Sequence, residues 1–228
     1  RAGAMTSNGS AMEIRFTGRG GHGSNPSETI DPVLMAARFI VDVQGVVSRE
    51  KDPAAFGVVG VGAIQGGSAG NIIPDSVLVK GTVRSQSDEV HQKLFAGIRR
   101  TANAVAQMSG APAPEIMLEG GVRSVVNDAA LTARVADTFR TAFGTHAQEL
   151  AAPWSGGEDY TEFVEAGVPS VYFGLGIYEP GRVAEARSTQ TPLPANHSPR
   201  FAPTDARLPL RTGVTAMTLA ALTALDRR

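Results

Sequence analysis

The chain has 228 residues, and 42% of them are hydrophobic, which is enough for one large domain or two small ones with a packed core. Its 21 basic and 22 acidic residues give a formal net charge of −1, so charge favours neither a nucleic acid nor an acidic membrane as a partner. The absence of cysteine excludes disulfides and thiolate metal ligands, and it agrees with a reducing compartment, so we expect a cytoplasmic protein. The longest apolar runs, such as residues 56–64, are too short to span a bilayer.

The first half of the chain alternates strand and helix patterns. Residues 12–17 alternate apolar and polar side chains, which predicts a half-buried strand. Asp31-Pro32 then predicts a helix start, with Asp as the N-cap and Pro in the first turn. The remaining predicted elements are strands over 56–64 and 76–84, a helix from Ser87-Asp88 to about 108, and a short strand over 115–118. The order β-α-β-β-α-β predicts a ferredoxin-like α/β sandwich.

The second half contains more helix than strand. The patterns predict a helix from Asn127-Asp128 to about 143, a Gly-rich loop over 154–160 with a short helix to 165, a buried strand over 168–175, a Pro-rich loop over 182–199, and a helix from Thr204-Asp205 to about 225. One or two strands are too few for an independent α/β domain, so we expect them to join a sheet whose other strands lie outside this chain.

His197 lies in the loop Asn196-His197-Ser198-Pro199 and is held between two prolines. A histidine with a fixed ring direction suits a metal ligand or a general base. Taken alone, a loop histidine that hydrogen-bonds a nearby carbonyl is the simpler interpretation. A metal site needs three or four ligands, and the acidic residues at 158, 159 and 205 have no recognised ligand spacing.

His22 lies among four glycines between positions 18 and 23, in a loop that would let the backbone and the imidazole approach a ligand closely. An exposed histidine in a flexible turn is an equally good interpretation. The loop also fits Gly-x-Gly-x-x-Gly after a strand, but the next helix begins only at Asp31, too late to place a pyrophosphate at its N-terminus. It lacks the Lys-Ser/Thr pair of a phosphate-binding Walker loop.

Three further positions carry polar groups suited to a substrate. Asn71 offers both a donor and an acceptor, although, taken alone, an asparagine in a turn is the better interpretation. Arg84 ends a predicted strand and could clamp a carboxylate, or could pair with an acidic residue at 88 or 89. Gly156-Gly157 could present backbone N–H groups to a carboxylate or oxyanion, or could simply begin a helix.

Six motifs extend over almost the whole chain: Gly20-Gly21-His22-Gly23-Ser24-Asn25-Pro26, Asp31-Pro32, Gly66-Gly67 with Asn71-Ile72-Ile73-Pro74-Asp75, Gly81-Thr82-Val83-Arg84, Gly157-Glu158-Asp159-Tyr160, and Asn196-His197-Ser198-Pro199 with Phe201. In this order they resemble the aminoacylase/carboxypeptidase family of metallohydrolases, metallopeptidase family 20, and most closely its amidohydrolase branch. One departure is Ser27, where that branch often has a second histidine.

The resemblance implies a catalytic domain with two zinc or similar divalent ions, such as manganese or cobalt, and an inserted lid that forms a homodimer. Residues 12–118 would be the lid, 119–228 the C-terminal part of an incomplete α/β catalytic domain of the zinc-exopeptidase type, and 1–11 a linker or remnant of that domain. The other metal-ligand and general-base motifs of the family have no counterpart here. We therefore expect a C-terminal fragment that is inactive alone and can lack bound metal.

The resemblance also implies roles for the two loop histidines. His197 resembles the family's C-terminal metal ligand. His22 resembles the catalytic lid histidine that reaches into the partner subunit's site and stabilises the tetrahedral intermediate.

Four more residues match groups that bind substrate in the family. Asn71 and Arg84 resemble lid groups that hold the substrate carboxylate, and Gly156 and Gly157 resemble a loop near that carboxylate. The expected reaction is hydrolysis of the amide bond of an N-acyl amino acid or a small peptide-like substrate. The alternative is a dimerisation or binding module without catalysis.

Overall fold

The computed structural model describes residues 1–226 and divides them into two compact units. One unit, here called the lid unit, contains Gly3–Val126 and Ala151–Val168. The remaining described residues form the second, C-terminal unit. The predicted lid, residues 12–118, therefore lies wholly inside the lid unit. Ala151–Val168 also belongs to this unit, although it follows the last lid strand at a distance along the sequence.

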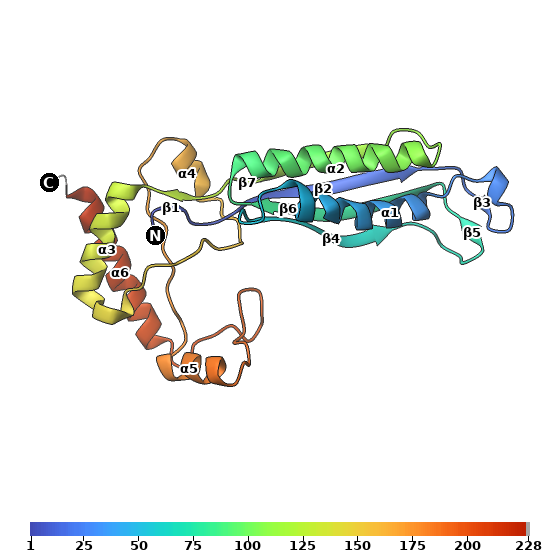
Figure 1. The fold of residues 1–228 in the computed structure, drawn as a ribbon. Coiled ribbons are helices and arrows are strands. Elements are labelled where there is room, and N and C mark those ends of the chain that lie inside the picture. Colours follow the sequence, from blue (N-terminus) through green and yellow to red (C-terminus); the bar gives the residue numbers. More distant parts are fainter. Residues whose placement is uncertain (227–228) are drawn as a thin grey trace. The chain divides into compact units, whose positions relative to one another are not determined.

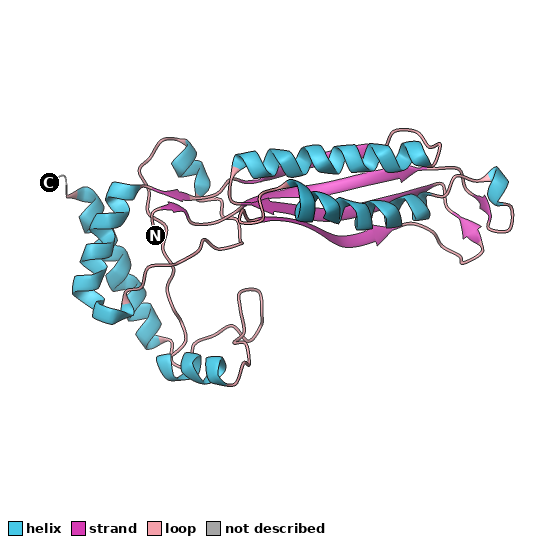
Figure 2. Ribbon diagram, viewed as in Figure 1, coloured by secondary structure: helices cyan, strands magenta, loops and turns pink. Residues whose placement is uncertain are grey.

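A four-stranded antiparallel sheet with the order β4-β6-β2-β7 forms the centre of the lid unit. Helices α1 and α2 cover one of its faces (Figure 2). The bounds of these elements are β2 (Asn8–Thr17), α1 (Pro32–Gly45), β4 (Gly57–Gln65), β6 (Ser76–Ser85), α2 (Asp88–Met108) and β7 (Glu115–Val122). The chain order and the strand order confirm the predicted ferredoxin-like β-α-β-β-α-β sandwich.

The core of the lid unit lies between the sheet and the two helices. Side chains of β2 alternate between the two faces of the sheet, and Met12, Ile14 and Phe16 are fully buried against the helices. Phe16 contacts Phe39 of α1, with the ring centroids 5.8 Å apart. Between these residues, Glu13 and Arg15 point to the opposite face, where Glu13 pairs with Lys80 at 2.8 Å. This alternation explains why the strand pattern was readable in the sequence.

The two helices of the lid unit, α1 and α2, begin where the sequence predicts. The Asp31 side chain accepts from the N–H groups of Val33 and Leu34, and Pro32 occupies the first turn of α1. The Ser87 side chain caps α2 by accepting from the Val90 N–H. These caps satisfy backbone donors that have no partner inside the helix, so short local sequence signals determine both starts.

Strand β7 is longer than predicted and is irregular near its end. Its pairing with β2 shifts register between Gly9 and Ala11. Gly121 lies in this irregularity with φ 117°, and a Cβ there would lie 1.5 Å from the Gly9 carbonyl oxygen. Only glycine allows the two strands to approach this closely.

The two ends of the lid sheet carry short elements, of which the sequence patterns predicted only the short helix that ends at residue 165 (Figure 1). At one end, here called the tip, β3 pairs with β5. At the other end, here called the base, lies α4 (Figure 1). The bounds of the short elements are β1 (Gly3–Ala4), β3 (Gly21–His22), a 3-10 turn (Pro26–Glu28), a π turn (Val46–Glu50), β5 (Ile72–Ile73), β8 (Val126–Asn127) and α4 (Thr161–Glu165).

The C-terminal unit is built around two packed helices, α3 and α6. Thr138 of α3 and Thr223 of α6 hydrogen-bond through their hydroxyl groups at 3.0 Å, and the Arg134 guanidinium donates to the Thr223 carbonyl. The helical elements of this unit are α3 (Ala129–Phe143), a 3-10 turn (Gly144–His146), α5 (Pro180–Ser188) and α6 (Arg207–Leu225).

Three predictions for the second half were wrong. Residues 168–175 are not a strand, because no described segment forms a ladder with them, and the Asn127 side chain instead bonds the Tyr172 N–H and carbonyl at 2.7 and 2.9 Å. The predicted loop over 182–199 begins inside helix α5, which the sequence reading missed. The predicted helix start at Thr204-Asp205 is also wrong, because the final helix begins at Arg207, and its N-cap Ala206 makes no side-chain cap bond.

Helix α6 exposes a series of large apolar side chains, which are Leu208, Leu210, Val214, Met217, Leu222 and Leu225. Among residues 1–226 it is the one helix long and apolar enough to cross a membrane, by length and composition only. Its apolar residues are interrupted by polar ones, so no uninterrupted apolar run indicates it. A core helix of a protein in water passes the same test, so the finding identifies an apolar helix and no more.

Candidate functional site

Two of the predicted substrate groups meet at the base of the lid unit. Arg84 lies at the end of β6, and its Nη1 donates to the Ser155 carbonyl at 3.3 Å. Ser155 immediately precedes Gly156 and Gly157. A Cβ at Gly157 would lie 3.9 Å from Arg84 Nη1, which places this loop beside the guanidinium. The alternative partner for Arg84, an acidic residue at 88 or 89, is absent from the ion pairs among the described residues.

An open cavity of about 250 Å³ lies beside the Arg84 guanidinium. Its lining comes from three strands and the glycine loop and consists of Gly9, Ser10, Ala11, Thr82, Arg84, Gly121, Val122 and Gly157. Except for Arg84 the lining side chains are small or absent. Arg84 is the only charged residue that lines the cavity, and its guanidinium can bind both oxygens of a carboxylate. The cavity is therefore suited to a small organic molecule that carries a carboxylate.

His22 and Asn71 meet at the tip. His22 of β3 pairs with Ile72 of β5, and the Gly23 N–H donates to the Asn71 carbonyl at 2.9 Å. The Asp75 side chain accepts from the Gly20 N–H at 2.9 Å and holds the start of the loop. The glycine-rich loop is therefore held by backbone pairing, and the histidine at its end is exposed.

The contacts of His22 favour one tautomer. The Ser24 N–H points at His22 Nδ1 at 3.2 Å, and the Ser24 hydroxyl lies 2.8 Å from the same atom. A backbone N–H can only donate, so Nδ1 must accept and the proton of the neutral ring must reside on Nε2. An exposed Nε2–H can donate to an oxygen that develops negative charge.

The tip and the base lie at opposite ends of the sheet (Figure 1). Strand β6 begins just after Asn71 and reaches Arg84 near its end, over 10 residues. At about 3.3 Å per residue the strand spans roughly 30 Å. The structure therefore brings Arg84 together with Gly156 and Gly157, and Asn71 together with His22, but does not bring Asn71 to Arg84 within one chain.

His197 lies in a loop of the C-terminal unit that has a strained backbone and is held by contacts of Tyr178. Its φ is 69°, a left-handed conformation that is uncommon for a residue other than glycine. The Tyr178 hydroxyl donates to the Pro194 carbonyl at 2.7 Å, and the Tyr178 ring packs edge-on against Phe201. The prolines indicate a stiff loop, but no sequence motif identifies this tyrosine.

The described residues do not form a metal site by themselves. Within residues 1–226 no three His, Asp or Glu side chains are grouped so that they could hold a metal ion. Of the acidic candidates, Asp205 is engaged by Arg207, whose guanidinium lowers the pKa of that carboxyl through hydrogen bonding. His197 could thus supply one ligand, which is fewer than a metal pair needs.

His91 is a buried histidine near the base. Its Nε2 lies 2.9 Å from the Ser10 hydroxyl and its Nδ1 lies 3.0 Å from the Ser85 hydroxyl. Burial lowers the pKa of His91, and the nearby Asp88 carboxylate opposes this shift. The one sequence signal was its helical spacing with Leu94 and Ile98, both of which are buried.

A pH dependence of stability follows from His91. Because its folded pKa is below the unfolded value, the neutral ring's contribution is complete above about pH 6.5 and is lost as the pH falls through the folded pKa. We expect His91→Gln to reduce the loss of unfolding free energy between neutral and acidic pH, measured by urea denaturation. His146→Gln, at an exposed position, is the control and should leave that loss unchanged. An identical pH dependence in His91→Gln and the unsubstituted chain would contradict the prediction.

The chain is similar to known proteins over most of its length. Residues 5–107 match the family model of the peptidase dimerisation domain. The chain is 36% identical over 222 residues to a probable hydrolase of Synechocystis sp., covering 97% of this chain and 53% of the relative. It is 33% identical over 188 residues to an N-acetyldiaminopimelate deacetylase of Leuconostoc citreum, covering 82% of this chain and 48% of the relative. The chain thus spans about half the length of the curated relatives it matches.

A solved structure agrees with the fold. The structure of a dinuclear metal-binding M20 peptidase from Bacillus subtilis matches with a TM-score of 0.72 and 22% identity, covering 100% of this chain and 53% of that one. The sandwich topology, the order of the tip and base motifs, and the similarity to hydrolases over most of the chain all support one assignment. The chain is therefore related to the M20 family of peptidases and hydrolases, whose dimerisation domain its residues 5–107 match.

Proposed function

We propose that this chain is the lid and C-terminal portion of a metal-dependent amidohydrolase that cleaves the amide bond of N-acyl amino acids or small peptide-like molecules. The observation that carries the proposal is the cavity at the base, where Arg84 and the Gly156-Gly157 loop lie together. The deacetylase named among the relatives acts on a molecule of this class.

The base cavity would hold the carboxylate of the substrate. A guanidinium has five N–H donors, and among the described residues one donor atom, Nη1, bonds a backbone carbonyl. The remaining donors can form a two-point contact with a carboxylate, which fixes both its position and its orientation. The glycine loop leaves the substrate room to reach them.

His22 would act on the carbonyl of the scissile amide. In the tautomer favoured by Ser24, the Nε2–H can donate to the carbonyl oxygen as it gains negative charge. Asn71 lies beside His22 and would add a second polar contact to the substrate. The two residues act as a pair because β3 and β5 are paired.

The substrate would be held by two copies of the chain. A small molecule at Arg84 cannot reach His22 of the same chain, because roughly 30 Å of strand separates the two ends of the sheet. If both groups contact one substrate, His22 and Asn71 come from the partner copy. We propose a homodimer formed through the lid unit, as the dimerisation-domain match supports.

The dimer surface would include the edge strand β4. This strand pairs only with β6 among the described strands, so one side of its backbone is available for another strand. Ile64 of β4 is 57% exposed, and Val41 of the neighbouring helix α1 is 70% exposed. Exposed apolar side chains beside an unpaired edge suit a protein partner.

Ile64→Lys should shift the chain from dimer to monomer, because a charge would then be buried at the edge of β4. The side chain is exposed, so folding should change little, by about 0.5 kcal/mol or less. Sedimentation velocity measures the result. Met117→Lys is a matched control, since Met117 is 40% exposed on the opposite edge strand β7. A monomeric unsubstituted chain, or an equal effect of both changes, would contradict the proposed surface.

The proposed cofactor is a divalent metal pair, with zinc as the expected ion. His197 would supply one ligand, and the described residues do not supply the rest. When bound, such a pair supplies an activated water molecule for attack on the amide carbonyl. What this chain contributes is the orientation of the substrate by Arg84 and the Nε2–H donor of His22.

The activity test compares this chain with the longer enzyme of which we propose it is a part. We expect no turnover of N-acetyl amino acids by the 228-residue chain with added zinc, manganese or cobalt, because one histidine cannot hold a metal pair. In the longer enzyme, His22→Ala and His197→Ala should each abolish turnover. If the longer enzyme keeps its activity after both changes, the alternative of a dimerisation module without catalysis is supported. Turnover by the chain alone would contradict the proposed division of the site.

A further inference from the structure

We propose that Ser7 is a positioning residue for the carboxylate-binding cavity at the base, an inference that rests on the function proposed above. Ser7 is fully buried and lies immediately before β2. Its hydroxyl donates to the Ser155 carbonyl at 2.6 Å and lies 3.2 Å from the Gly156 carbonyl. Its backbone N–H donates to the Gly156 carbonyl at 2.8 Å. One residue thus holds both peptide units that precede Gly157.

Ser7 and Arg84 share an acceptor. The Ser155 carbonyl accepts from the Ser7 hydroxyl and also from Arg84 Nη1. The Ser7 hydroxyl therefore holds the Ser155 carbonyl in place, and that carbonyl in turn holds Arg84 Nη1. Without the Ser7 hydroxyl, the loop could shift toward Arg84 and occupy donors that a carboxylate would otherwise use.

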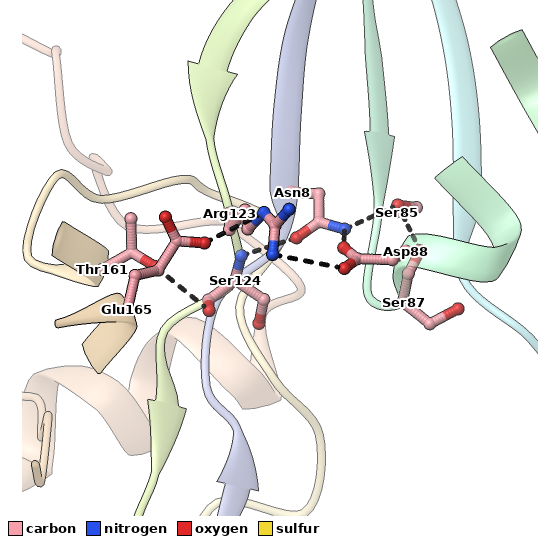
Figure 3. Close-up of polar contacts among 8 residues, drawn as sticks. All are labelled: Asn8, Ser85, Ser87, Asp88, Arg123, Ser124, Thr161 and Glu165. Carbon is pink, nitrogen blue, oxygen red and sulfur yellow. Dashed lines mark hydrogen bonds and ion pairs between the residues drawn. The ribbon is translucent and has the colours of Figure 1, made fainter. Parts of the chain in front are cut away.

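The residue after Ser7 keeps this part of the strand in place. The Asn8 side chain donates to the Asp88 carboxylate at 3.0 Å, and its Oδ1 accepts from the Ser124 N–H at 2.6 Å. Figure 3 shows Asn8 between Asp88 of α2 and Ser124, the latter in the segment that follows β7. Buried polar groups that are satisfied from several elements resist displacement. Ser7 therefore donates from a fixed position.

The loop is also attached to the base on either side of Gly157. The Trp154 N–H donates to the Met5 carbonyl at 2.9 Å. Further along, the Thr161 hydroxyl donates to the Ser124 carbonyl at 3.4 Å, and Arg123 pairs with Glu165 at 2.9 Å (Figure 3). These contacts hold the ends of the segment, and Ser7 is the residue that holds its middle, beside Arg84.

The test uses this 228-residue chain and the probe N-acetyl-L-alanine, followed through the Arg84 Nε–H and Gly157 N–H signals in ¹⁵N NMR spectra. We expect the probe to shift both signals in the unsubstituted chain. Ser7→Ala should weaken probe binding about 5- to 10-fold, the effect of one hydrogen bond. It should also shift the Gly156 and Gly157 signals before any probe is added.

Ser124→Ala is the matched control. Ser124 is also a buried serine at the base, and its hydroxyl donates to the Thr6 carbonyl at 2.7 Å, but it does not touch residues 155–157 through its side chain. It should cost similar stability without weakening probe binding. Ser7→Cys nearly preserves the side-chain volume and supplies only a weak donor, so it should weaken binding as Ser7→Ala does even if the alanine variant is poorly folded.

The outcomes separate this inference from the function on which it rests. If the unsubstituted chain binds the probe and both Ser7 variants bind it equally well, the positioning role is overturned and the carboxylate site stands. Equal weakening by Ser7→Ala and Ser124→Ala would likewise overturn it, because both would then act through stability. If the unsubstituted chain shows no shift at Arg84 or Gly157, the carboxylate site itself is overturned.

Discussion

Arg84→Ala should abolish most carboxylate binding at the base cavity. Hydrogen bonds to a charged partner contribute about 1.5–3 kcal/mol, so we expect the affinity for N-acetyl-L-alanine to fall roughly 10- to 100-fold. Arg84→Lys should recover only part of this loss, because an ammonium group cannot form the two-point contact of the guanidinium fork. NMR titration or calorimetry on the 228-residue chain measures the affinities.

Two controls make the Arg84 result specific. Arg15→Ala removes another arginine from the sheet, one that faces Glu115 at 3.7 Å and does not line the cavity. It should leave binding unchanged. N-acetyl-L-alaninamide, which lacks the carboxylate, should bind the unsubstituted chain and Arg84→Ala equally weakly. If the amide binds as tightly as the acid, the cavity does not recognise a carboxylate and the proposed role of Arg84 fails.

Phe39→Ala should destabilise the lid unit by about 3–5 kcal/mol, the usual cost of removing a buried aromatic side chain. Phe39 is fully buried in α1 and packs against Phe16 of β2, so its loss leaves a cavity between helix and sheet. The chain's single tryptophan, Trp154, belongs to the lid unit and can report its unfolding by fluorescence in urea. A loss of this size is a large part of the stability of a domain.

Val33→Ala is the control for Phe39 because Val33 is on the same helix and is 46% exposed. It should change the free energy of unfolding by about 0.5 kcal/mol or less. A Phe39→Ala effect below about 1 kcal/mol would mean that α1 does not pack on the sheet as described.

Local signals made much of the lid predictable. The alternation that ends in Phe16 and the caps at Asp31 and Ser87 each depend on residues a few positions apart, and all three appear in the structure where the sequence places them. The helix from Asp128 is also confirmed, with the Asp128 side chain accepting from the Leu131 N–H. Predictions failed where the structure depends on distant neighbours, as for residues 168–175, whose apolar pattern finds no strand to pair with among the described residues.

The candidate site was predictable only in part. The glycine-rich motifs identified the loops of His22, Asn71, Gly157 and His197, because close backbone approach requires glycine and stiff loops require proline. Their roles remain predictions. The burial of His91 could not be inferred from its own segment, since Ser10 and Ser85, its hydrogen-bond partners, lie on two other elements.

The sequence by itself determined the order of strands and helices in the lid, the starts of the helices that follow Asp31, Ser87 and Asp128, and the motifs that indicate the family, because these depend on short-range periodicity and on which residue types tolerate a given backbone. Only the tertiary structure decided which motifs share a cavity. It places Arg84 beside Gly157 and at the far end of the sheet from Asn71, although Arg84 and Asn71 are near neighbours in sequence. The physical reason is that an extended strand separates its ends by about 3.3 Å per residue, whereas hydrogen bonds such as that from Ser7 to Ser155 join residues far apart along the chain.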